Sequence, residues 1–361
     1  MAFIDTLELF NFKSHVNFKK EFQNDKHIVI FGKNGVGKTN LLESLSYFSN
    51  LKGLRGDKVE NLFSNLSKEP KVKLKLKFQG YKKVYKISYE FEKKVDKIEK
   101  QFFLDEQKIS HNNIKKFLNF VWLSPYLDKV MYEGNTIKRN FIDKLVSQNS
   151  EIFSKNHSSY KKNISERISI LKKSNDERWL SIIEEKISQE MYNIFEERRK
   201  FAENLTNEIK QKLSNFREIK IFYNNENLTA QKDKDHLIEI FKNKLLKNRQ
   251  IDEISKRTNF GINTDEVVFF DVKNNLNTDS CSTGEQKSSL LSIILGNCWM
   301  MKKNEKDFIL LLDEATSHID SFNFAKLFEE VEKFNTQIWY TGTSKNLFQV
   351  IENKGFFIEL A

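Results

Sequence analysis

Cysteine and proline are scarce in this chain of 361 residues, which contains two of each. Cys281 and Cys298 have neither the spacing of metal ligands nor the number that a disulfide framework needs, so a reduced cytoplasmic compartment is the simplest interpretation. Both prolines lie before residue 126, and the stretch from 135 to 260 contains neither proline nor glycine. Long helices can therefore run through that stretch without interruption.

Long apolar segments are also missing. The N-terminal residues include Asp5 and Glu8, which argues against a secretory signal peptide there. The longest apolar run, from Leu290 to Met301, is broken by serine, glycine and asparagine, and it is too short to span a bilayer. We therefore expect no membrane partner.

Arginine is the rare basic residue, since nine of the 60 basic side chains are arginine and the others are lysine. The formal net charge is +10 and the isoelectric point is about 9.2. This balance favours a polyanionic partner such as nucleic acid. A lysine-rich composition of the whole genome would give the same charge, so the charge alone leaves DNA binding open.

The segment from 32 to 39 fits the pattern G-x-x-x-x-G-K-[ST] of the phosphate-binding P-loop. A short apolar run precedes it and a helical pattern follows it, as this motif requires. Lys38 is expected to reach the β- and γ-phosphates, and the Thr39 hydroxyl is expected to ligate Mg²⁺. Arg55, in a later basic turn, could reach a phosphate or could be an exposed loop arginine. The predicted ATP-binding residues of the loop are Gly32, Lys33, Asn34, Gly35, Val36, Gly37, Lys38 and Thr39.

A continuous apolar run from Phe308 to Leu312 predicts a strand of a parallel sheet that is buried on both faces. Asp313 and Glu314 follow it directly. Beside a P-loop, Asp313 can hold the Mg²⁺ that Thr39 ligates, and Glu314 can activate the attacking water as a general base. Two solvated acids at a strand end are the alternative.

Two further patterns indicate the remaining architecture. Residues 71–78 alternate between lysine and apolar side chains, which predicts a half-buried antiparallel strand. Its lysine row could face a phosphate backbone, although a solvated face is the commoner meaning. Apolar residues at helical spacing from Trp179 to Leu213 predict one long helix.

The order of these motifs resembles that of the ABC-type ATPase heads, because a Ser282-Thr-Gly-Glu-Gln-Lys287 signature precedes the acidic strand end. Within that class the chain resembles the RecF family, bacterial recombination mediators related to the SMC proteins. An SMC protein would need hundreds of residues where this chain has only a short helical lobe. The further matches are Asn11-Phe12, Gly35 to Glu43, Trp122 to Pro125, Lys138 to Asp143, Leu310 to Ala315 and Trp339 to Thr343.

The resemblance implies an α/β fold: an ABC-type P-loop ATPase head, whose mixed sheet has an antiparallel part, with an inserted all-helical lobe and no long coiled coil. Residues 1–134 and 250–361 would form the head, and residues 135–249 the helical lobe. ATP would join two chains head to tail and would be hydrolysed slowly. Ser282, Thr283 and Gly284 would cap the γ-phosphate on the partner's P-loop, and Asp320 would help to couple the two sites.

The resemblance also implies partners. Family members bind gapped or duplex DNA as such dimers, and they work with RecR and RecO to place RecA at gapped DNA, which connects them to the SOS response. Two positions depart from the family: Gly261-Ile-Asn-Thr264 replaces Gly-Pro-His-Arg, and Lys138-Arg139 replaces paired arginines. A nucleotide-binding subunit of an ABC transporter and an ATPase subunit of a phage-defence system are the alternatives. Gly342 and Thr343 stand where transporters usually have a histidine, which weakens the first.

Overall fold

The computed structural model describes residues 2–49, 51, 53–80, 83–114, 117–173, 176–224, 233–314 and 321–361. The chain divides into two compact units. The first comprises residues 1–128 and 298–361, and the second comprises residues 129–297.

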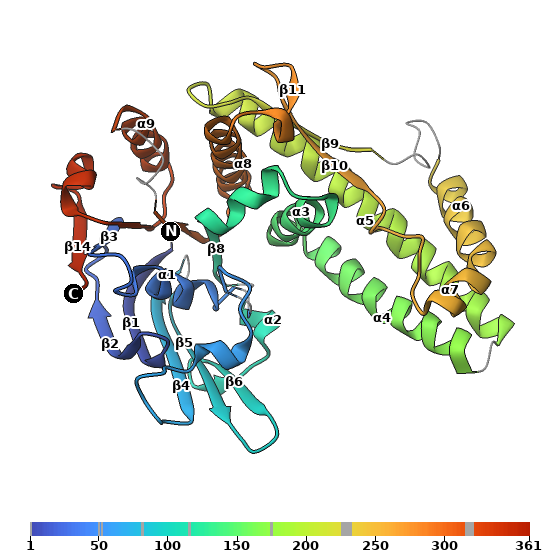
Figure 1. The fold of residues 1–361 in the computed structure, drawn as a ribbon, viewed down its shortest axis with the longest axis horizontal. Helices are drawn as coiled ribbons and strands as arrows, with labels where there is room; N and C mark the ends of the chain where they lie inside the picture. Colours follow the sequence, from blue (N-terminus) through green and yellow to red (C-terminus); the bar gives the residue numbers. More distant parts are fainter. Residues whose placement is uncertain are drawn as a thin grey trace. The chain divides into compact units, whose positions relative to one another are not determined.

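A five-stranded parallel sheet forms one part of the first unit (Figure 1). Its central strand β13 (Ile338–Gly342) and the neighbouring strand β12 (Phe308–Leu312) are buried along their whole length. The expected doubly buried strand before Asp313 is therefore confirmed. In spatial order the strands are β14 (Gly355–Glu359), β3 (His27–Phe31), β13 (Ile338–Gly342), β12 (Phe308–Leu312) and β8 (Asn119–Leu123).

The second sheet of this unit has six antiparallel strands. The apolar side chains of its third strand point into the core, and the lysines of that strand point outward, as the alternation predicts. In spatial order the strands are β2 (His15–Glu21), β1 (Phe3–Phe12), β4 (Lys71–Gln79), β5 (Val84–Lys93), β6 (Ile98–Leu104) and β7 (Gln107–Lys108).

The lysine row of β4 faces carboxylates on its two neighbouring strands. Lys73 lies opposite Glu90 on β5 with an ion pair of 3.2 Å, and Lys75 lies opposite Glu8 on β1. Cross-strand pairs of opposite charge stabilise a solvated sheet face. The arrangement favours the solvated-face interpretation of this row over a phosphate-binding one.

Helix α1 (Lys38–Ser46) packs between the two sheets, with Leu41, Leu42 and Leu45 fully buried in the same core as side chains from both sheets. Helix α9 (Ser321–Glu332) buries Leu327 and Val331. The first unit also contains α2 (His111–Ile114) and the 3₁₀ helices η1 (Val59–Leu62) and η4 (Lys345–Ile351), and η2 (Pro125–Met131) begins in it.

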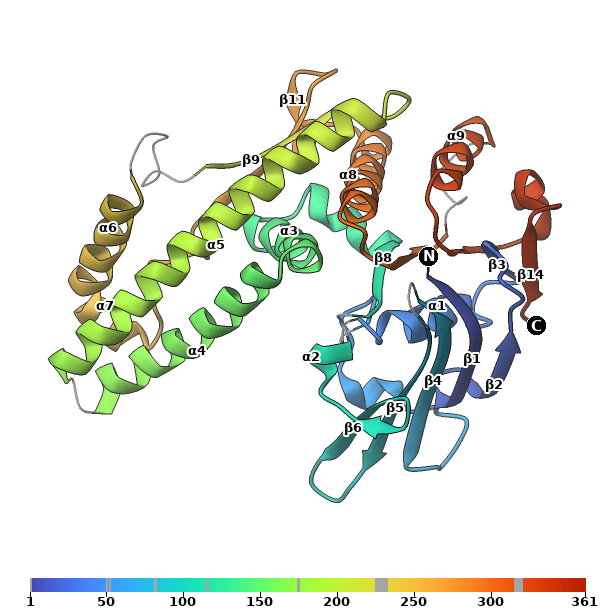
Figure 2. The same ribbon diagram turned by 180° about the vertical axis from the view of Figure 1, so that it is seen from behind.

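Long helices form most of the second unit (Figure 2). Asp176 caps the longest of them, α5, by accepting a hydrogen bond of 3.0 Å from the Trp179 amide. Its 36 residues confirm the predicted long helix, and α4 and α6 pack against it. The helices are α3 (Asn135–Asn149), α4 (Glu151–Lys173), α5 (Glu177–Lys212), α6 (Lys234–Lys247), α7 (Arg249–Ser255) and the first part of α8 (Thr283–Lys303).

A three-stranded antiparallel sheet accompanies these helices, in the order β11 (Leu276–Asn277), β10 (Glu266–Asp271) and β9 (Ile219–Asn224). The lobe that was expected to be all-helical therefore also contains β9. Residues 250–297, expected in the head, pack within the second unit instead. The reason is that β10 pairs with β9 along its whole length, and α7 packs against α4.

None of the helices that the structure describes has the length and apolar character needed to cross a bilayer.

Candidate nucleotide-binding site

The P-loop lies where the sequence predicts it, between the end of β3 and the start of α1. Gly37 caps the helix with a φ of +100°, in the left-handed region that favours glycine. A Cβ at this position would come within 2.3 Å of Ser14 Oγ. Lys33, Asn34 and Gly35 are exposed, so the loop presents its tip to solvent.

The Lys38 side chain folds back over the loop. Its ammonium donates hydrogen bonds of 2.7 Å to the Gly32 carbonyl and 2.8 Å to the Lys33 carbonyl. The side chain is buried, and that burial lowers the pKa of Lys38, although Glu314 and Asp313 favour its charged form. The lysine predicted to contact phosphate is therefore held against the first two residues of the loop.

Thr39 and Asp313 meet at one edge of the parallel sheet. The Thr39 hydroxyl donates to Asp313 Oδ1 at 3.0 Å, and the Thr341 hydroxyl donates to the same oxygen at 2.7 Å. Strand β13 lies between β3 and β12, so its end places Thr341 between the P-loop and the acidic strand end. Burial raises the pKa of Asp313, and the hydrogen bonds from Thr341 and Thr39 oppose that rise.

Glu314 follows Asp313 with a φ of +51°. Non-glycine residues seldom adopt this left-handed conformation, which is found at turns and also at functional sites. Its backbone amide donates to Thr341 Oγ1 at 2.8 Å, and its side chain is exposed. The predicted base therefore stands beside the predicted metal ligand with an exposed carboxylate.

Arg55 lies beside the first turn of α1. Its guanidinium donates to Asn40 Oδ1 at 3.3 Å and stacks over the ring of Tyr126, 5.3 Å from the ring centre. Asn40 directly follows Thr39, and its own amide group donates to Ser14 Oγ at 2.9 Å. The structure therefore brings Arg55 to the P-loop helix, as a contact with phosphate would need. The predicted coupling residue Asp320 lies outside the described residues.

The signature forms a reciprocal cap at the start of α8. Ser282 donates to Glu285 Oε2 through its amide, at 3.0 Å, and through its hydroxyl, at 2.9 Å. The Glu285 amide donates back to Ser282 Oγ at 3.4 Å. This S-x-x-E arrangement is a capping box, a local pattern that is visible in the sequence. Ser282, Thr283 and Gly284 are exposed.

A second layer of polar groups holds Glu285 in turn. Arg217 donates to Glu285 Oε1 at 2.7 Å and also to Asp271, and Asn274 donates to Glu285 Oε1 at 2.8 Å. Hydrogen bonds from Asn274 and Ser282 lower the pKa of Glu285 to about 2, and Arg217 contributes to the shift. Neither Arg217 nor Asn274 belongs to a recognisable motif, so their role could not be predicted from sequence patterns.

The motif from Lys138 to Asp143 acts inside the second unit. Arg139 donates to the Asp265 carbonyl at 2.7 Å, and Asp143 accepts hydrogen bonds of 2.8 and 2.7 Å from the buried Arg198. Arg198 also donates to the Ile262 carbonyl at 2.8 Å. These bonds tie helices α3 and α5 to the segment that replaces Gly-Pro-His-Arg.

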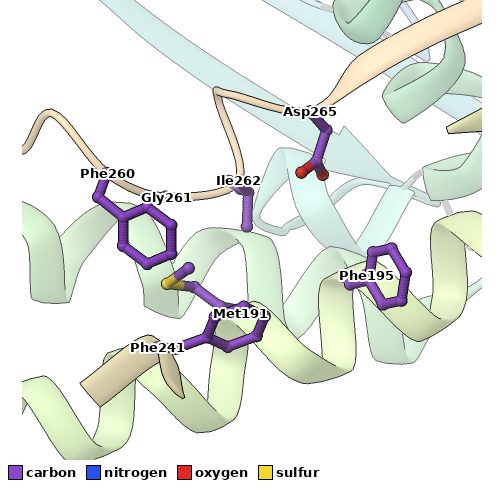
Figure 3. A pocket seen from close by; sticks show the side chains of 7 residues that line it. All are labelled: Met191, Phe195, Phe241, Phe260, Gly261, Ile262 and Asp265. Atoms are coloured by element: carbon purple, nitrogen blue, oxygen red, sulfur yellow. The ribbon is translucent and has the colours of Figure 1, made fainter. Parts of the chain in front are cut away.

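That segment lines a small cavity with residues from α5 and α6 (Figure 3). Met191 and Phe260 point toward each other in it, and Asp265 lies at one end. Its volume is about 10 Å³, no more than one water needs. Of the three departures from the family pattern, Ile262 is buried against this cavity, whereas Asn263 and Thr264 are exposed.

The whole chain is similar to curated proteins of two rickettsial species. It is 29% identical, over an alignment of 367 residues, to the DNA replication and repair protein RecF of Rickettsia felis, with 99% of this chain and 98% of that protein covered. The protein of the same name from Rickettsia rickettsii (strain Sheila Smith) is also 29% identical, with 99% of each chain covered. The predicted resemblance to RecF is confirmed. No protein-family model matches the chain.

Solved structures give the same answer for the fold. The recombination mediator protein RecF in the structure named RecF-ATPrS superposes with a TM-score of 0.83 at 24% identity, covering 99% of this chain and 96% of that chain. An SMC head domain with an extended coiled coil, from Pyrococcus furiosus, gives a TM-score of 0.54 at 15% identity, covering 100% of this chain and 94% of that chain. The expected ABC-type ATPase head fold is therefore confirmed.

Proposed function

We propose that this chain is an ATP-dependent DNA-binding protein that acts in recombination, replication and repair, the processes given in the names of its RecF relatives. One observation carries the proposal. Lys38, Thr39 and Asp313 converge at a single sheet edge in a chain that is similar to RecF over its whole length.

The groups at this edge fit ATP with Mg²⁺. A hydroxyl beside a carboxylate, as in the Thr39 and Asp313 pair, provides the oxygen ligands that Mg²⁺ prefers. Burial raises the pKa of Asp313, so a neighbouring cation would help to keep this carboxylate charged. When bound, Mg²⁺ neutralises phosphate charge. Thr39 and Asp313 would hold it, while Lys38 and Arg55 contact phosphate oxygens.

Hydrolysis would depend on Glu314. Its carboxylate is exposed beside Asp313, and its backbone is fixed by the hydrogen bond from its amide to Thr341. In this position Glu314 would orient a water and accept its proton. We expect a weak ATPase, because the nucleotide serves mainly to hold two chains together.

The signature glycine supports the head-to-tail dimer. A Cβ at Gly284 would meet nothing within 4 Å in the described part of the chain, and no positive φ requires glycine there. Alanine would favour the helix by up to about 1 kcal/mol. Close approach by a partner's γ-phosphate would explain the glycine, with Ser282, Thr283 and, outside the described residues, Asp320 completing that site.

DNA, RecR and RecO, and through them RecA, are the partners that this proposal includes, with a cytoplasmic location. The net charge of +10 supports the DNA part, since phosphate contacts by lysine and arginine account for much of DNA affinity.

The proposal is tested on Lys38→Met, with Lys97→Met, at an exposed turn lysine, as the matched control. Analytical ultracentrifugation should show dimers of the wild type and of the control with ATP but not with ADP, and monomers of Lys38→Met. Affinity for gapped duplex, measured over a salt series, should rise with ATP and fall steeply with salt. ATP-dependent dimers of Lys38→Met would refute the nucleotide site, and a salt-independent affinity would refute the DNA role.

A further inference from the structure

We propose that Thr341 is a positioning residue of the ATPase site, which aligns the metal-ligating carboxylate of Asp313 and the backbone of Glu314 through a single hydroxyl. The inference rests on the proposed function, because it assigns a role within that same site.

The position of Thr341 in the sheet makes the double contact possible. Strand β13 lies between the P-loop strand β3 and the acidic strand β12, and Thr341 is fully buried near its carboxyl end. Its hydroxyl has one proton and two acceptor lone pairs. The proton goes to Asp313 Oδ1 at 2.7 Å, and a lone pair accepts the Glu314 amide at 2.8 Å. The Thr341 hydroxyl therefore acts at this site both as a donor and as an acceptor.

The contact with Asp313 helps to fix the orientation of its carboxyl group. Thr39 and Thr341 both donate to Oδ1, from opposite neighbouring segments, so the carboxyl group cannot rotate without losing both bonds. Without the Thr341 hydroxyl, this oxygen would keep the bond from Thr39 and lose the shorter one, so the carboxylate would be less firmly oriented for ligating Mg²⁺.

The contact with Glu314 fixes its backbone. A φ of +51° is unfavourable for a residue with a Cβ. The hydrogen bond from the Glu314 amide helps to hold this conformation, which decides where the exposed carboxylate points. Hydrophobic side chains of the same size at position 341 would fill the space but would lose both bonds.

The test compares Thr341→Val, which keeps the shape and removes the hydroxyl, with Thr341→Ser, which keeps the hydroxyl. Binding of a fluorescent ATP analogue without Mg²⁺ should change less than about twofold in both. In Thr341→Val we expect that about tenfold more Mg²⁺ is needed for half of the gain in ATP-analogue affinity that Mg²⁺ provides. We also expect single-turnover ATP hydrolysis to be about tenfold slower, as loss of a hydrogen bond to a charged group implies. Thr341→Ser should match the wild type in both measurements.

Hydrogen exchange at the Glu314 amide gives a readout that needs neither nucleotide nor turnover. It should speed up in Thr341→Val and stay slow in Thr341→Ser. Wild-type Mg²⁺ response and exchange in a folded Thr341→Val protein would overturn the assignment. If the valine variant does not fold, Thr341→Ala takes its place, and an alanine variant equal to the serine variant overturns the assignment equally. Failure of the proposed function is distinct, since the wild type itself would then bind no ATP.

Discussion

The Thr39 hydroxyl lies 3.0 Å from Asp313 Oδ1 although 274 positions separate the two residues in the sequence. The parallel sheet causes the encounter, because β3 and β12 end at the same edge with only β13 between them. The P-loop and the acidic strand end, which the sequence predicts to hold one Mg²⁺, thus lie within hydrogen-bonding distance of each other.

Removing the charge of Asp313 should separate metal binding from nucleotide binding. In Asp313→Asn we expect ATP affinity without Mg²⁺ to stay within about twofold of the wild type, while the gain that Mg²⁺ provides falls about tenfold or more. Titration of a fluorescent ATP analogue with and without Mg²⁺ measures both. Asp96→Asn, at an exposed turn, is the control. A full Mg²⁺ effect in Asp313→Asn would show that another residue holds the metal.

Replacing the proposed base should stop turnover without releasing the nucleotide. We expect Glu314→Gln to lower the single-turnover rate of ATP hydrolysis by about 10²- to 10⁴-fold, since the base is lost. The dimer should then persist with ATP in ultracentrifugation. Glu106→Gln is a matched control, because Glu106 is exposed and also left-handed, with a φ of +70°. Wild-type turnover in Glu314→Gln would remove it as the base.

Mixing two inactive variants tests whether the site is shared between chains. Lys38→Met lacks a working P-loop, and Ser282→Arg places a bulky cation at the exposed signature. A mixed head-to-tail dimer has one doubly defective site and one intact site. ATP hydrolysis should therefore reappear on mixing, whereas neither variant is active alone. If the mixture stays inactive while hetero-dimers form, the signature does not complete the partner's site.

The pH dependence of the signature cap follows from Glu285. Hydrogen bonds from Asn274 and Ser282 lower its pKa from 4.5 to about 2 in the folded chain. The ionised Glu285 carboxylate therefore stabilises the folded chain fully above pH 4.5, and this contribution to the free energy of unfolding is lost as the pH falls toward 2. Urea unfolding of the wild type and of Glu285→Gln should show a constant stability difference above about pH 5 that narrows on acidification. A difference that widens toward pH 2 would contradict the assignment.

Much of the site could be read from the sequence because its motifs are local. The loop from Gly32 to Thr39 and the strand ending in Asp313 each carry their chemistry within a few neighbouring residues. Thr341 escaped notice as part of the site because a lone threonine has no pattern. Arg217 escaped for the same reason, since its contact with Glu285 spans 68 positions.

The domain boundary shows the same limit. The sequence indicated where glycine and proline are missing, and the long helix α5 was confirmed there. The partner of β9 could not be read from it, because strand pairing joins segments across any length of chain. Only the structure showed that β10 provides that partner.

By itself, then, the sequence determined the class of chemistry, since phosphate binding, metal ligation and helix periodicity depend on residue types at short spacing. The tertiary structure decided that Asp313 and Glu314 both bond the Thr341 hydroxyl, and that Arg217 bonds the Glu285 carboxylate of the signature cap. It also decided which segments pack with α5. Those choices depend on the order of strands and on the burial of charged groups, and both arise only when distant segments pack together.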